Sequence, residues 1–125
     1  MKDISISEMM DMQMELWNMN KGIWNKMEPK QARNMMLWMI EEIGEAIAII
    51  KKKGEIEIME NSEVRERFIE EMVDIMMYYS AVMLRLEITP EEFASMYHKK
   101  QNKNKERNFK KQYDNFINGN RGDKE

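Results

Sequence analysis

The chain has no cysteine, one histidine, two prolines and five glycines among its 125 residues. Without cysteine it can form neither a disulfide framework nor a thiolate metal site, which suits a reducing cytoplasm. So few glycines and prolines leave too few turn signals for a β architecture. The single histidine, His98, has no glutamate three residues before it. This excludes a carboxylate bundle that binds two iron ions through Glu-x-x-His pairs.

The sequence also lacks membrane and export signals. No segment approaches the roughly 20 apolar residues of a membrane span. The first residues, "MKDISISEMMDMQ", carry acids where a signal peptide would carry bases. A formal net charge of −3 gives no electrostatic argument for nucleic acid or for a membrane surface. We therefore expect a cytoplasmic protein without either kind of partner.

What is present indicates an all-α protein. Hydrophobic residues make up 42% and charged residues 34% of the chain, which fits helices with one apolar stripe and a solvated remainder. A capping box of Ser5 and Glu8, Pro29 at a first turn, and Ser62, Thr89 and Pro90 as later helix starts mark the boundaries. The predicted helices are 5–18, 29–53, 62–86 and a fourth that begins at 89–90.

The second predicted helix stops at Gly54, and a polar linker with a short extended piece follows in "GEIEIMEN". Its expected core stripe has the spacing of a helical face. The stripe consists of Met36, Ile40, Ile43, Ile47 and Ile50. We predict one domain over residues 1–117 and a disordered tail over 118–125, "NGNRGDKE".

Two acidic pairs interrupt apolar segments. Glu42 and Glu45 lie three residues apart in "IEEIGEAI", and Glu71 and Asp74 repeat that spacing in "FIEEMVDIMMYY". Residues three apart leave the same side of a helix. If the two helices pack antiparallel, the four carboxylates converge and need protons or cations to neutralise them. Oxygen ligands select hard cations such as Mg²⁺, Mn²⁺ or Ca²⁺.

These paired motifs, in a short all-α chain, resemble the MazG-type nucleotide pyrophosphohydrolases, whose relatives include the all-α dimeric dUTPases. The resemblance covers about residues 24–107. It implies a four-helix MazG-like bundle completed by homodimerisation, or a dimer of dimers. It implies Mg²⁺, with Mn²⁺ as the alternative, held by Glu42, Glu45, Glu71 and Asp74. The implied reaction is attack of water on a nucleoside triphosphate, which releases the monophosphate and pyrophosphate. The candidates for the general base are Glu41, Glu42 and Glu45.

A basic stripe lies in the fourth predicted helix. Its members, Tyr97, Lys100, Asn104 and Arg107, are similar to the residues that contact phosphates in the dUTPase-like branch. The alternative is a solvated cationic face, because further lysines surround them. Where dUTPase relatives have a Gly-Tyr pair after the arginine, this chain has "NFKKQYD". A dUTPase-like diphosphatase therefore remains an alternative within the enzyme class.

Aromatic side chains near the acids suggest a base pocket. Trp38 lies four residues before Glu42 and shares its face. Trp24 is a second candidate for stacking, and Arg33 and Asn34 are candidates for polar contacts. The pattern does not identify the base. An alternative to the enzyme is a non-catalytic helical oligomer or partner-binding protein, in which the acids form only a solvated face.

Overall fold

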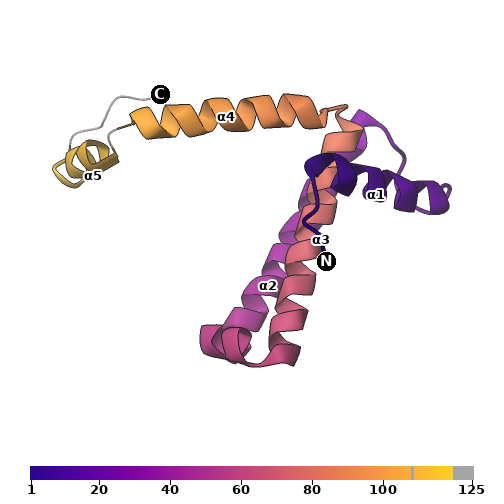
Figure 1. Cartoon of the computed structure of the whole chain (residues 1–125), viewed down its shortest axis with the longest axis horizontal. Helices are drawn as coiled ribbons and strands as arrows, with labels where there is room; N and C mark the ends of the chain where they lie inside the picture. Colours follow the sequence, from indigo (N-terminus) through magenta and orange to yellow (C-terminus); the bar gives the residue numbers. More distant parts are fainter. Residues whose placement is uncertain (108, 120–125) are drawn as a thin grey trace. The chain divides into compact units, whose positions relative to one another are not determined.

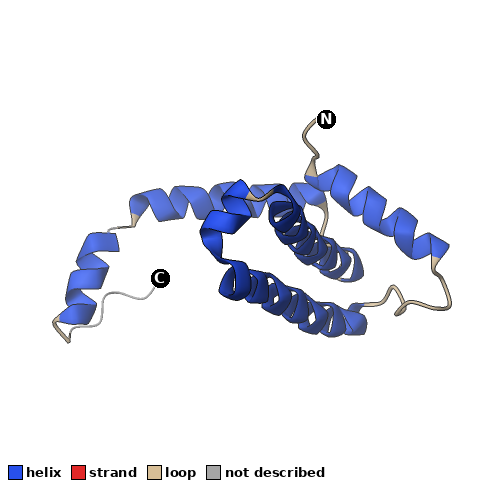
Figure 2. Cartoon of the chain, turned by 90° about the horizontal axis from the view of Figure 1, so that it is seen from below, coloured by secondary structure: helices blue, strands red, loops and turns tan. Residues whose placement is uncertain are grey.

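The computed structural model describes residues 1–107 and 109–119, and every regular element in these residues is helical (Figure 2). The all-α prediction is confirmed. None of these described helices combines the length and the apolar character needed to cross a membrane. The elements are α1 (Ile6–Met19), the short 3₁₀ helix η1 (Pro29–Gln31), α2 (Ala32–Glu60), α3 (Ser62–Arg85), α4 (Pro90–Glu106) and α5 (Phe109–Ile117).

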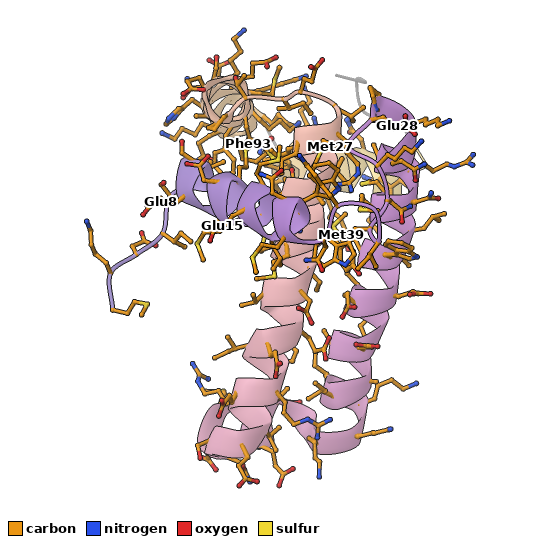
Figure 3. The ribbon with its side chains drawn as sticks, turned by 90° about the vertical axis from the view of Figure 1, so that its right-hand side faces the viewer. Glu8, Glu15, Met27, Glu28, Met39 and Phe93 are labelled. Carbon is orange, nitrogen blue, oxygen red and sulfur yellow. The ribbon has the colours of Figure 1, made fainter. Side chains whose placement is uncertain are left out.

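The chain divides into two compact units, Met1–Pro90 and Glu91–Glu125, which are described separately. In the first unit, α2 and α3 lie side by side as an antiparallel hairpin (Figure 1). Helix α1 packs on α3 near one end of this hairpin, and η1 contacts both α2 and α3. Figure 3 shows Met27, in the connection between α1 and η1, at that same end.

The hairpin turn departs from the expected linker. Gly54 has φ 83° and ψ 160°, a conformation that only glycine adopts readily, so the predicted break at this residue is confirmed. The helix then resumes and continues to Glu60, and the expected extended piece is wrong. The Asn61 side chain accepts hydrogen bonds from the backbone N–H groups of Glu63 (3.0 Å) and Val64 (3.2 Å). Asn61, and not Ser62, therefore caps α3.

The face of α2 that packs on α3 differs from the predicted stripe. The buried residues of α2 are Ala32, Met35, Ala46 and Ile49. The stripe expected in the core is exposed in the single chain, from 40% at Ile43 to 61% at Ile40. Helix α2 is apolar on two adjacent faces, and one residue turns a helix by about 100°. The prediction from hydrophobic periodicity therefore chose the apolar face of α2 that is exposed in the single chain, and not the face that packs on α3.

The helix starts and the C-terminal unit complete the description. The capping box is confirmed, because the Ser5 N–H donates to Glu8 Oε1 and the Glu8 N–H donates to Ser5 Oγ. The second unit contains a helix, α5, that the sequence analysis did not predict. Of the expected tail, Asn118 donates its N–H to the Asp114 carbonyl at the end of α5, and residues 120–125 lie outside the described residues.

Candidate functional site

Helices α2 and α3 bring three of the four predicted metal ligands together. Glu42, Glu45 and Glu71 each offer a carboxylate oxygen, and these oxygens lie within 4.8 Å of one another. Glu42 and Glu71 are half-buried in the seam between the two helices, whereas Glu45 is exposed. Asp74 is half-buried one turn further along α3 and lies outside this group of three. We call the four residues the acid cluster.

The carboxylates of the acid cluster are poorly compensated. Glu42 Oε2 and Glu71 Oε2 are buried and have no hydrogen-bond partner among the described residues. No lysine or arginine in the described ranges forms an ion pair with any member of the cluster. Buried charges without a partner are costly, so such groups bind protons or cations.

The charges in the cluster act on one another. Burial, hydrogen bonding to Glu71 and the charge of Glu45 together raise the pKa of Glu42 to about 7. Burial also raises the pKa of Glu71, and the charges of Glu45 and Asp74 act in the same direction. Asp74 is therefore electrostatically part of the cluster. A divalent cation fits this set of hard oxygen donors and would remove the repulsion.

The acid cluster opens onto a pocket of about 490 Å³ at the end of the hairpin where α1 packs. Glu42 and Asp74 form part of its wall. The chain has three tryptophans, and all of them line this pocket. We call it the aromatic pocket. Its aromatic side chains are Trp17 from α1, Trp24 from the following connection, Trp38 from α2 and Tyr78 from α3.

Local contacts order these rings. Trp38 and Tyr78 meet edge to face, with ring centroids 6.1 Å apart and planes inclined by 64°. Trp17 donates its Nε1–H to the Asn25 carbonyl at 2.8 Å. Burial raises the pKa of Tyr78, and the negative charge of Glu42 adds to this effect. The side chain of Tyr78 therefore stays protonated beside the acid cluster.

The residues predicted for the base pocket divide into two groups. Trp24 and Trp38 line the aromatic pocket, but Arg33 and Asn34 are not part of its wall. Arg33 is exposed, and Asn34 donates its Nδ2–H to Gln31 Oε1 at 2.8 Å. Glu41, the outermost candidate for the general base, is exposed and does not belong to the group of converging oxygens.

Sequence reasoning missed Arg85, which is 4% exposed and lines the aromatic pocket. Its guanidinium donates to three backbone carbonyls, those of Lys26, Ala81 and Asn25, at 3.0–3.2 Å. Burial lowers its pKa from the ordinary value. The signal was available, because Arg85 interrupts the apolar segment "AVMLRLEI" as Asp74 interrupts its own.

The predicted phosphate-binding residues all belong to the second unit. Tyr97 and Lys100 are exposed on α4, and Asn104 is half-buried. Arg107 lies over the Phe109 ring at 4.4 Å and donates from Nη2 to Gln112 Oε1 at 2.9 Å. Because this unit is described by itself, phosphate binding by the four residues stays a prediction.

Taken together, the first unit has the parts to hold a divalent cation at one edge of a pocket that suits a flat ring. A ligand with an anionic group and an aromatic ring would use both regions at once. Comparison with protein-family models, with curated proteins and with solved structures finds no match for this chain.

Proposed function

We propose that the protein is a Mg²⁺-dependent nucleoside triphosphate pyrophosphohydrolase, which converts a nucleotide to its monophosphate and pyrophosphate. One observation carries the proposal: Glu42 and Asp74, of the acid cluster, line the same pocket as all three tryptophans. A nucleotide has this polarity, with a cation-binding phosphate chain at one end and a stacking base at the other. The resemblance of the paired acidic motifs to MazG-type enzymes points the same way.

In this proposal, Glu42, Glu45, Glu71 and Asp74 hold the cation. Mg²⁺ would neutralise phosphate charge and favour deprotonation of water at neutral pH. The cluster supplies hard oxygen donors, two of them buried and without a partner, which supports cation binding. Mn²⁺ would fit the same donors.

The general base remains one of Glu41, Glu42 and Glu45. Exposure favours Glu45 among the converging carboxylates, because solvent reaches it while Glu42 and Glu71 keep buried oxygens. The base must lie within hydrogen-bonding reach of the attacking water. Tyr97, Lys100, Asn104 and Arg107 are proposed to bind the phosphate chain.

The test is release of pyrophosphate from a panel of natural and modified nucleoside triphosphates with Mg²⁺. We expect monophosphate and pyrophosphate in equal amounts, and complete loss of turnover with a chelator. Glu71→Gln should abolish the reaction, whereas Glu70→Gln, an exposed neighbour, should not. Absence of pyrophosphate from every substrate with either Mg²⁺ or Mn²⁺ would refute the proposal. Selective hydrolysis of dUTP would favour the dUTPase-like alternative.

One observation favours a second function, that of a helical oligomer or partner-binding protein. The apolar stripe of α2 is uncovered in the single chain, and exposed apolar patches of this kind are typical of protein interfaces. The stripe comprises Met36, Ile40, Ile43, Ile47 and Ile50. A non-catalytic role is the alternative to the enzyme, but oligomerisation by itself is compatible with catalysis. We propose that a second copy of the chain covers the stripe in a homodimer.

A further inference from the structure

Arg85 is a buried cation without a carboxylate partner. It is 4% exposed, and it forms no ion pair within residues 1–107 and 109–119. Removing a guanidinium from water without a neutralising charge is costly. An arginine that served only to end α3 would lie in solvent near the last carbonyls. Its burial therefore calls for a second role.

Part of that role is to hold one wall of the aromatic pocket. Arg85 Nε donates to the Lys26 carbonyl at 3.1 Å, and Nη2 donates to the Asn25 carbonyl at 3.0 Å. The Asn25 carbonyl also accepts from Trp17 Nε1. Arg85 thus links α3 to the connection that carries Trp24. Trp17 of α1 is hydrogen-bonded to the same connection, at the same Asn25 carbonyl.

The three hydrogen bonds do not use the whole guanidinium. The group has five N–H donors, and the third bond runs from Nη1 to the Ala81 carbonyl within α3. Two N–H donors therefore have no acceptor among the described residues, in a side chain that lines the pocket. Buried donors of a charged group gain most from an oxygen acceptor, and they are penalised when a ligand offers none.

We propose that Arg85 positions the 20–28 wall of the aromatic pocket and selects aromatic rings with an exocyclic carbonyl oxygen over rings with an exocyclic amino group. Identification of the ring as a nucleobase rests on the proposed function. The carbonyl oxygen accepts a hydrogen bond from a guanidinium N–H. An exocyclic amino group would instead place its own N–H donors next to those of the guanidinium, and no hydrogen bond could form between them. The site therefore favours oxo bases, and adenine, which has no carbonyl, is the base it rejects.

Deoxyinosine and deoxyadenosine provide the test in the wild-type protein. They are nearly equal in size and stacking surface, and they differ at the exocyclic group and at the adjacent ring nitrogen N1, which carries a hydrogen only in deoxyinosine. The intrinsic fluorescence of the chain reports binding directly, because all three tryptophans line the pocket. We expect deoxyinosine to bind about tenfold or more tightly than deoxyadenosine. Equal affinity, or no binding of either nucleoside, would overturn the proposal.

Two variants test whether the preference between the two nucleosides comes from the N–H donors of Arg85 or only from the packing of the pocket. Arg85→Met keeps the length of the side chain and removes every donor, so the preference for deoxyinosine should disappear and the tryptophan emission should change as the wall loosens. Arg67→Met, at an exposed position on α3, is the matched control and should keep the wild-type preference. A folded Arg85→Met protein with the wild-type preference would overturn the proposal. The wild-type comparison decides the matter if this variant does not fold.

The outcome is independent of hydrolysis. Nucleosides have no phosphates, so their binding requires neither metal nor turnover. Pyrophosphate release without discrimination between the two nucleosides would overturn the role of Arg85 and leave the proposed function standing. Discrimination without pyrophosphate release from any triphosphate would support the role of Arg85 and count against the enzyme.

Discussion

The aromatic pocket shares Gln13, Leu16 and Met77 with a second hollow of about 580 Å³ between α1 and α3, but the rest of the two linings differs in polarity. The second hollow, which we call the methionine groove, is lined mainly by apolar side chains. Seven methionines and isoleucines line it without lining the aromatic pocket: Ile4, Met9, Met12, Met19, Ile69, Met72 and Met76. The polar residues in its lining are Gln13, Glu15 and Ser80. The aromatic pocket contains the buried guanidinium of Arg85 and two members of the acid cluster.

The two hollows differ in the kind of molecule that would bind them favourably. The groove exposes apolar surface, and any apolar cover would reduce its contact with water. The pocket holds charged groups of both signs that are not paired with each other within the described residues. Such groups lower stability unless a ligand compensates them, so the pocket is suited to a ligand with complementary charge and shape.

The largest expected effect comes from Asp74→Asn, which keeps the shape of the pocket and removes one charge. Hydrolysis should fall on the order of 100-fold or more, as for other removed electrostatic contacts. Without metal the variant should be as stable as wild type or slightly more so, because repulsion within the acid cluster decreases. The stabilisation of wild type by Mg²⁺, which follows from preferential binding to the folded state, should disappear.

Melting curves of both proteins with and without Mg²⁺ check this prediction, together with a pyrophosphate assay. Glu70→Gln is the control, since it removes one charge from an exposed position on the same helix. A destabilised Asp74→Asn protein, combined with a wild type that Mg²⁺ does not stabilise, would contradict cation binding by the acid cluster. The aromatic pocket would then not differ from the methionine groove in this respect.

A smaller effect is expected outside both hollows, in the proposed phosphate stripe. Lys100→Ala should reduce kcat/KM about tenfold, the loss typical of one hydrogen bond to a charged group. Lys99→Ala changes another exposed lysine, on the adjacent face of α4, and should have little effect. The folded state should be unchanged in both variants. Equal losses would indicate a diffuse positive field in place of a discrete site.

Assembly tests whether the uncovered apolar surface is an interface. We expect wild type to be a homodimer, and Ile40→Lys combined with Ile47→Lys to be a folded monomer. Both residues are at least half exposed in the single chain, so charge at these positions should oppose association more than folding. Light scattering measures the mass, with Glu55→Lys as an exposed control on α2. A monomeric wild type at micromolar concentration would contradict the prediction.

The sequence predicted the acid cluster better than the packing around it. Helical spacing alone places Glu42 beside Glu45 and Glu71 one turn before Asp74, so an antiparallel hairpin suffices to bring them together. It does not choose between two adjacent apolar faces of α2, because that choice depends on which face α3 covers. Arg85 was missed for a related reason: a single arginine near a helix end is expected to interact with the helix dipole.

The smallest expected effect is a dependence of stability on pH. It arises from Glu42, which lines the aromatic pocket and not the methionine groove. The pKa of Glu42 is raised from 4.5 to about 7, so the metal-free folded state binds this proton more tightly than the unfolded state. The resulting stabilisation is complete below about pH 4.5 and is lost as the pH rises through about 7. The melting temperature of the metal-free protein should therefore fall by roughly 4 °C or more between pH 5.5 and pH 8.

Mg²⁺ should act in the opposite direction, because it competes with the proton for the same carboxylates and binds more tightly as they ionise. Its stabilising effect should therefore grow from pH 5.5 to pH 8. Glu42→Gln should flatten the metal-free dependence, whereas Met72→Leu, in the methionine groove, should retain it. A metal-free wild type whose melting temperature rises over this interval would show that the carboxylates are compensated by another group, and the contrast between the two hollows would then fail.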